Sequence, residues 1–150
     1  MIEFSVGMSS YGPLITGLIG LFFAFVLYGL IMRYPAGKSS VVKIGDQIHL
    51  GAKVFMFTEY KILAPVVIVL IVACGLSPLG WYTALAIGVG ALSSAIAGFI
   101  GMYSATKANV RTATAAENSG KEQALSISFF GGSIMGLCVA SMGLVGLVGL

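Results

Sequence analysis

Side chains that could take part in chemistry are scarce in this chain, and the most distinctive group of them lies in one polar segment at positions 101–113. Lys107 and Arg111 stand four residues apart there, so a helix would place both on one face. Asn109 lies between them in the sequence and would share a face with Ala105. From the residue types alone, the segment is interpreted as a helix end whose cations complement the helix dipole and an anionic lipid surface.

The acidic residues are too few and too far apart for acid–base catalysis or metal binding, which both need carboxylates placed close together. His49 is interpreted as a solvated or interfacial side chain, and neither a CxxC pair nor a phosphate-binding loop occurs. Cys74 and Cys138 lie in apolar stretches, where free cysteines serve as small packing residues. We therefore expect no catalytic, cofactor-binding or metal-binding residue in this chain. The acidic residues are Glu3, Asp46, Glu59, Glu117 and Glu122.

The elements that carry these residues are expected to lie in lipid. Hydrophobic residues make up 58% of the 150 positions and charged residues only 9%, and the mean hydropathy is +1.03. A soluble domain carries about 25% charged residues, so this chain cannot maintain a water-facing surface over most of its length. The net charge of +3 does not indicate nucleic acid as a partner, because no basic patch is interleaved with aromatic residues.

Three stretches without charged residues predict four membrane spans. Crossing ~30 Å of hydrocarbon takes about 20 apolar residues, so the middle stretch can hold two spans, divided by the glycine–proline turn at 75–80. The predicted fold is therefore an all-α bundle of transmembrane helices. The stretches are 4–32, 62–106 and 123–150, and the predicted spans are 11–32, 62–76, 81–102 and 125–150.

The second and third spans are predicted to continue beyond the bilayer as long helices over 41–76 and 81–116. Upstream of the second span, apolar residues recur at helical spacing with lysines and Asp46 between them. The alternative for this upstream segment is a separate amphipathic helix lying on the membrane surface.

The basic residues predict the orientation in the membrane. They fall into two segments, 33–61 and 107–122, whereas the turn between the second and third spans has none. Because two spans separate these segments, both lie on one side, which the positive-inside rule makes cytoplasmic. The N-terminus is then outside.

Helix contacts within a bilayer depend on small residues that let backbones approach closely. At intervals of four, the third span offers Gly90, Ser94 and Gly98, and these are the predicted contact residues of that helix. The fourth span offers Gly132, Gly136 and Ala140 at the same interval.

The run from Gly101 to Ala116 resembles a signature of the membrane-integral pyrophosphatases, G-M-x-x-A-T-x-A-N-x-R-x-A-x-A-A, on their third helix. The stretch 123–137 resembles the start of the fourth helix of that family, and 48–61 resembles the segment that leads into its second. The three similarities follow the family order and span nearly the whole chain.

This resemblance implies a pump of about 16 spans in which pyrophosphate hydrolysis drives H⁺ or Na⁺ outward. It implies magnesium pyrophosphate as substrate and potassium as an activator in some members. It also implies that these helices pack against the remaining helices of a longer chain, and that the full-length protein is a homodimer. The aspartate-rich motifs of the family do not occur in this chain, so no catalytic, metal or ion-gate residue is carried over. Lys107, Asn109 and Arg111 match positions of the family that are not substrate ligands, and their role is not assigned. The four helices are then outer-ring scaffold, unable to hydrolyse pyrophosphate alone.

Two alternatives come from other classes. One is a non-catalytic helical membrane scaffold or assembly subunit. The other is a rotor-ring proteolipid, which needs an ion-binding carboxylate in the middle of the membrane, and none of the predicted spans has one.

Overall fold

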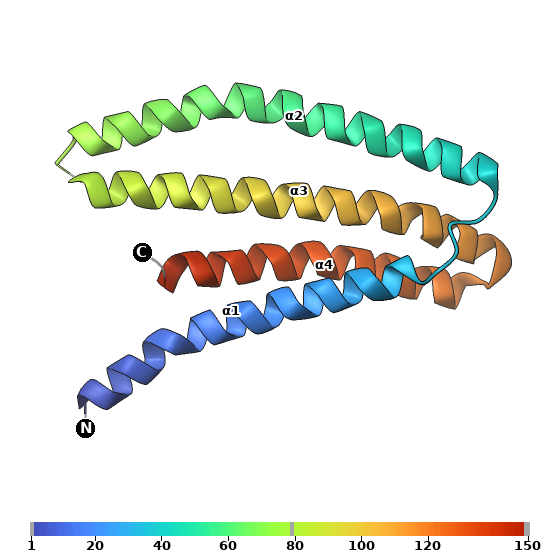
Figure 1. Cartoon of the computed structure of the whole chain (residues 1–150), viewed down its shortest axis with the longest axis horizontal. Coiled ribbons are helices and arrows are strands. Elements are labelled where there is room, and N and C mark those ends of the chain that lie inside the picture. Colours follow the sequence, from blue (N-terminus) through green and yellow to red (C-terminus); the bar gives the residue numbers. More distant parts are fainter. Residues whose placement is uncertain (1, 79, 149–150) are drawn as a thin grey trace.

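A computed structural model describes residues 2–78 and 80–148, and within that part of the chain it contains α-helices and no strands (Figure 1). All four helices are long and apolar enough to cross a membrane. The prediction of an all-α transmembrane bundle is thereby confirmed. The helices are α1 (Ile2–Met32), α2 (Ser39–Leu76), α3 (Gly80–Asn118) and α4 (Lys121–Val148).

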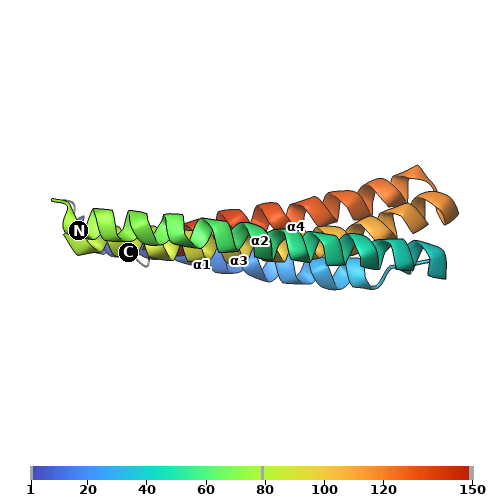
Figure 2. The same cartoon turned by 90° about the horizontal axis from the view of Figure 1, so that it is seen from above.

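The helices lie side by side in the order α2, α3, α4, α1, each roughly along the long axis of the molecule (Figures 1 and 2). The largest contacts join α3 to α4, α1 to α4 and α2 to α3, whereas α1 touches α3 only slightly. The helix α4 therefore lies between α1 and α3 and forms the floor of a groove between them.

Two helices are much longer than the bilayer is thick. With 38 residues in α2 and 39 in α3, each extends about 57–59 Å at 1.5 Å per residue, against ~30 Å of hydrocarbon. The segment upstream of the second span is continuous with it in α2, as the single-helix interpretation predicted, and no separate surface helix is present there. Roughly half of α2 and of α3 must then project into water or into other parts of a larger protein.

The turns between helices agree with the glycine and proline signals. Ser77 ends α2, and its backbone N–H and its hydroxyl both donate to the carbonyl oxygen of Cys74, at 3.3 and 2.8 Å. The α3–α4 connection turns at Gly120, whose φ of 92° lies in the left-handed region that favours glycine.

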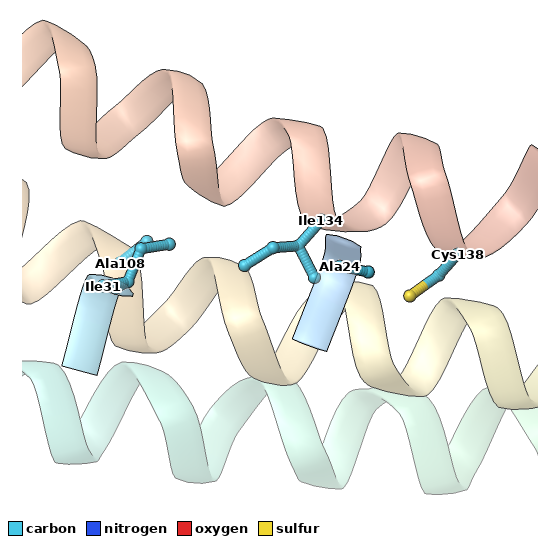
Figure 3. Close-up of a cluster of buried hydrophobic side chains, with 5 residues drawn as sticks. All are labelled: Ala24, Ile31, Ala108, Ile134 and Cys138. Carbon is cyan, nitrogen blue, oxygen red and sulfur yellow. The ribbon is translucent and has the colours of Figure 1, made fainter. Parts of the chain in front are cut away.

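The core is narrow and consists of small and branched side chains. Ala24 and Ile31 of α1, Ala108 of α3, and Ile134 and Cys138 of α4 are all nearly fully buried (Figure 3). Burial of the Cys138 side chain agrees with the expected packing role, and Cys74 is half-buried.

The small-residue stripe predicted for α4 does not lie in the contacts among these four helices. Gly132, Gly136 and Ala140 are exposed, and α4 instead packs through the neighbouring register, in which Gly131 faces Ala108. A stretch with two adjacent glycines supports two registers, and spacing alone could not decide between them. Packing of the exposed register against helices outside this chain stays a prediction.

The stripe predicted for α3 is divided in the same way. Gly90 and Ser94 are exposed, whereas Gly98 is half-buried against α2. A Cβ atom added at Gly98 would lie 3.4 Å from the Tyr60 hydroxyl and 3.6 Å from the terminal methyl of Met56. Gly98 is thus the one residue of that stripe at a contact within the described chain.

Candidate functional site

The signature segment forms the last turns of α3, where the other helices meet it. The Tyr34 side chain, just after α1, packs on the cluster of Ala115, Ala124 and Ile127 from α3 and α4. At Gly45 of α2, an added Cβ atom would overlap Val110, so the two backbones approach closely there.

Arg111 fixes the connection that follows α1. Its Nε donates to the Tyr34 carbonyl oxygen at 3.1 Å, and its Nη1 donates to the Lys107 carbonyl oxygen at 3.0 Å. The rigid guanidinium fork can satisfy both carbonyl groups at once, which a lysine ammonium at the same place could not do. Arg111 therefore joins α3 to the α1–α2 connection.

Thr114 makes a second link to the same connection. Its Oγ1 lies 3.0 Å from the carbonyl oxygens of both Ala36 and Val110. The adjoining Gly37 has a φ of 85° and passes so close to Thr114 that a Cβ atom there would overlap the threonine side chain. A glycine is therefore required at position 37 on both counts.

Thr106 joins α3 to α2 through His49. The hydroxyl of Thr106 donates to the Tyr103 carbonyl oxygen at 2.9 Å, and its Oγ1 lies 2.7 Å from His49 Nδ1. The His49 ring also packs edge-on against Tyr103, with 4.9 Å between ring centroids.

Each ion pair at this end has at least one well-exposed partner. Lys38 Nζ lies 2.5 Å from Glu117 Oε1, with 68% and 48% of the two side chains exposed. The hydrogen bond to the Glu117 carboxylate raises the pKa of Lys38 above its usual value. Lys107 Nζ lies 3.8 Å from Asp46 Oδ1, which is too long for a hydrogen bond. Exposed pairs of this kind contribute little to stability.

The structure brings together only part of the predicted group. Lys107 and Arg111 are linked through the Lys107 carbonyl oxygen, as their spacing predicts. Asn109 does not join Lys107 and Arg111: it is exposed and lines a cavity of about 260 Å³ between α2 and α3. Sequence reasoning missed the roles of Thr106 and Thr114, and it interpreted His49 as a solvated or interfacial side chain. The partners of Thr114 are backbone carbonyl groups, which carry no sequence signal.

The arrangement braces the helices against one another. Across residues 2–78 and 80–148, no three His, Cys, Asp or Glu side chains gather closely enough to hold a metal ion. Asp46 lies beside Lys107, and Glu117 is paired with Lys38. The donor set of the described residues therefore does not fit Mg²⁺, which prefers carboxylate oxygens in octahedral geometry.

Four long apolar helices, tied together at one polar end, define a segment of a multi-pass integral membrane protein. The sequence model of the family "Inorganic H+ pyrophosphatase" matches residues 18–150. The chain belongs to this family, and the resemblance noted in the signature segment is confirmed.

Relatives agree over most of the chain. A protein of Clostridium tetani is 43% identical over 123 residues, covering 82% of this chain and 18% of that protein. A K(+)-stimulated pyrophosphate-energized sodium pump of Thermotoga maritima is 39% identical over 132 residues (87% of this chain, 18% of the pump). A K(+)-insensitive pyrophosphate-energized proton pump of Moorella thermoacetica is 33% identical over 134 residues (89% and 20%). The chain thus spans about a fifth of the length of these relatives.

Proposed function

We propose that this chain is the N-terminal part of a membrane pump that couples pyrophosphate hydrolysis to the outward transport of H⁺ or Na⁺. The observation that supports this most is the family match over residues 18–150, which includes the whole signature segment. Relatives named as pyrophosphate-energized pumps of both ions share this part of the sequence. This match outweighs the alternatives of an independent scaffold subunit and a rotor proteolipid.

Within that pump, these four helices serve as scaffold. Three polar side chains of the signature segment hold neighbouring parts of the chain: Arg111 contacts Tyr34, Thr114 contacts Ala36, and Thr106 contacts His49. Magnesium and the phosphate groups are then held by residues outside this chain, and potassium activation and the homodimer contact also depend on the longer chain. The segment alone does not hydrolyse pyrophosphate.

The orientation proposed for the pump follows from its basic residues. Segments 33–61 and 107–122 lie in the cytoplasm, and the N-terminus lies outside. The structure is compatible with this arrangement, because the α1–α2 and α3–α4 connections lie at the same end of the molecule (Figure 1).

The test is pyrophosphate-driven transport by the full-length protein in sealed inside-out vesicles. With magnesium pyrophosphate outside the vesicles, either Na⁺ accumulates inside or the interior becomes acidic. A protonophore should abolish the acidification and leave Na⁺ uptake intact, which separates the two ions. Hydrolysis without movement of either ion would contradict the proposal.

A further inference from the structure

Two charged residues of α2 lie level with the middle of an uncharged stretch of α3. The Tyr60 hydroxyl donates to the Ala95 carbonyl oxygen at 2.6 Å, which fixes the level of its neighbours Glu59 and Lys61. The α3 residues 80–106 include no charged residue and extend about 40 Å. Ala95 lies about 22 Å from the start of this stretch and about 17 Å from its end.

The other two helices are also apolar at this level. Ser94 of α3 and Met142 of α4 line one cavity of about 360 Å³. Ser141 lies against Gly20 of α1, where an added Cβ atom would overlap the serine hydroxyl. These positions lie well inside the uncharged stretches of their helices. A hydrocarbon layer placed on the uncharged parts of α1, α3 and α4 therefore includes the level of Glu59.

Aromatic side chains give the depth of Glu59 in this layer. Trp81 and Tyr82 at the start of α3 are 68% and 89% exposed, as in the aromatic belt at a membrane interface. A hydrocarbon layer of ~30 Å that begins after Tyr82 ends about 20 residues later, near Tyr103. On α2 this level lies close to His49, whose ring packs against Tyr103. Glu59 is then about 10 Å inside the hydrocarbon.

This depth refines the cytoplasmic segment 33–61 of the proposed function, because its last turns enter the inner half of the bilayer. It also accounts for the length of α2. The predicted span 62–76 extends only about 22 Å, which is too short for a layer of ~30 Å. The missing length comes from the turns that carry Glu59 and Lys61.

Glu59 lacks a charged partner at this depth. None of the ion pairs among residues 2–78 and 80–148 includes it. Lys61 is two positions away and points to another side of α2, and its longer side chain can reach toward the cytoplasmic interface. An acidic side chain within a membrane almost always faces protein or water and is paired there. Lipid is therefore an unfavourable neighbour for Glu59.

The surface around Glu59 suits a further helix. Ile48 stands eleven residues before Glu59, so both lie on one face of α2. Ile48 and Asn109 line the same cavity of about 260 Å³, so this face opens on the Asn109 side of α3. Ala105 and Ser94 continue that side of α3 at spacings of four and eleven residues. Small residues of this kind let another helix approach closely.

We propose that Glu59 forms an ion pair within the membrane with a lysine or arginine on a further helix of the longer pump, and that this helix packs beside Ser94. The chain spans 18% and 20% of two pumps that it matches, so about four fifths of such a protein lies outside it. Charge complementarity selects a cationic partner. The proposal rests on the proposed function only in taking this chain as part of a longer pump.

The first test measures whether Glu59 is in water. Single cysteines replace Glu59 or Lys43 in a cysteine-free form of the full-length pump, in inside-out vesicles treated with a membrane-impermeant maleimide. Lys43 is the matched control, because it is exposed on the cytoplasmic part of the same helix. We expect Glu59→Cys to react about a hundredfold more slowly than Lys43→Cys, since a thiol in hydrocarbon does not ionise to the reactive thiolate. Equal rates would overturn the proposal.

The second test identifies the neighbour. The full-length pump carries a photoactivatable benzophenone amino acid at position 59, and the cross-linked peptides are identified by mass spectrometry. We expect a cross-link to an apolar segment beyond residue 150 of the same polypeptide that carries a lysine or arginine. Adducts with lipid alone would overturn the proposal, and so would a cross-link only to the partner subunit.

The third test exchanges the charges. Glu59→Lys should lower the melting temperature of the full-length pump, because two cations then face each other in a medium of low dielectric constant. Replacing the cross-linked cation by glutamate in the same protein should recover most of that loss. No recovery would overturn the ion pair. None of the three measurements depends on pyrophosphate-driven transport, so their failure would leave the proposed function untouched.

Discussion

Arg111 Nε on α3 lies 3.1 Å from the carbonyl oxygen of Tyr34, to which it donates a hydrogen bond across 77 positions of the sequence. The bond ties the end of the signature helix to the chain that leaves α1. Since α1 and α2 do not touch each other directly, this connection positions both helices relative to α3.

Arg111→Lys should destabilise the protein, although the charge is kept. The replacement loses at least one of two charge-assisted hydrogen bonds, each worth about 1.5–3 kcal/mol. Thermal unfolding of the full-length protein measures the effect. Arg33→Lys is the control, because Arg33 is exposed, and it should unfold at the unchanged temperature. Equal melting temperatures for the two variants would show that the Tyr34 contact carries no stability.

Two threonines on α3 form a natural pair for comparison. Thr114→Val removes the hydrogen bond to Ala36 and should cost about 0.5–1.5 kcal/mol. Thr112 has a buried Oγ1 without a hydrogen-bond partner among the described residues, so Thr112→Val should be neutral or stabilising. Chemical denaturation of both variants gives the two free energies. A larger loss in Thr112→Val would mean that this hydroxyl has a partner outside the chain.

The register of α4 can be tested at two adjacent glycines. A Cβ atom at Gly131 would lie 2.7 Å from Ala108 Cβ, so Gly131→Ala should overpack the α3–α4 contact and cost about 1–3 kcal/mol. A Cβ atom at Gly132 meets no atom within 4 Å in this chain, and Gly132→Ala should not disturb that contact. The free energies of unfolding of the two variants show which glycine lies in the α3–α4 contact. If Gly132→Ala lost more stability than Gly131→Ala, α4 would contact α3 through the stripe of Gly132 and Gly136 instead.

The sequence predicted the four apolar helices for a physical reason. Charge in hydrocarbon is costly, so Arg33 and Lys107 lie at the ends of apolar stretches, and glycine with proline marks the turn at 75–80. The fourth predicted span reached Leu150, and positions 149–150 lie outside the described residues.

The contacts of the candidate site were harder to predict. The spacing of Lys107 and Arg111 indicates a shared face. It does not reveal that Arg111 donates to the backbone carbonyl group of Tyr34, which lies in a connection with no regular structure. The choice between Gly131 and Gly132 depends on a rotation of α4 by a single residue, about 100°. Such a rotation is fixed by the neighbouring helices, and helical spacing within one segment cannot reveal it.

The link between α2 and α3 should show as coupling between His49 and Thr106. His49→Phe and Thr106→Val each break the 2.7 Å hydrogen bond, so the double variant should lose less stability than the sum of the single variants. We expect a coupling of about 0.5–1.5 kcal/mol. Denaturant unfolding of the four proteins in the double-mutant cycle measures it. Strict additivity would show that the two side chains act independently.

The central claim is that these helices brace a pyrophosphate-energised pump and do not touch its substrate. The most direct measurement is the KM for magnesium pyrophosphate of the full-length pump carrying Arg111→Lys, taken together with its melting temperature. The account predicts a lower melting temperature and a KM within about twofold of the unmodified pump. A KM raised about tenfold or more at an unchanged melting temperature would make Arg111 a substrate ligand and contradict the claim.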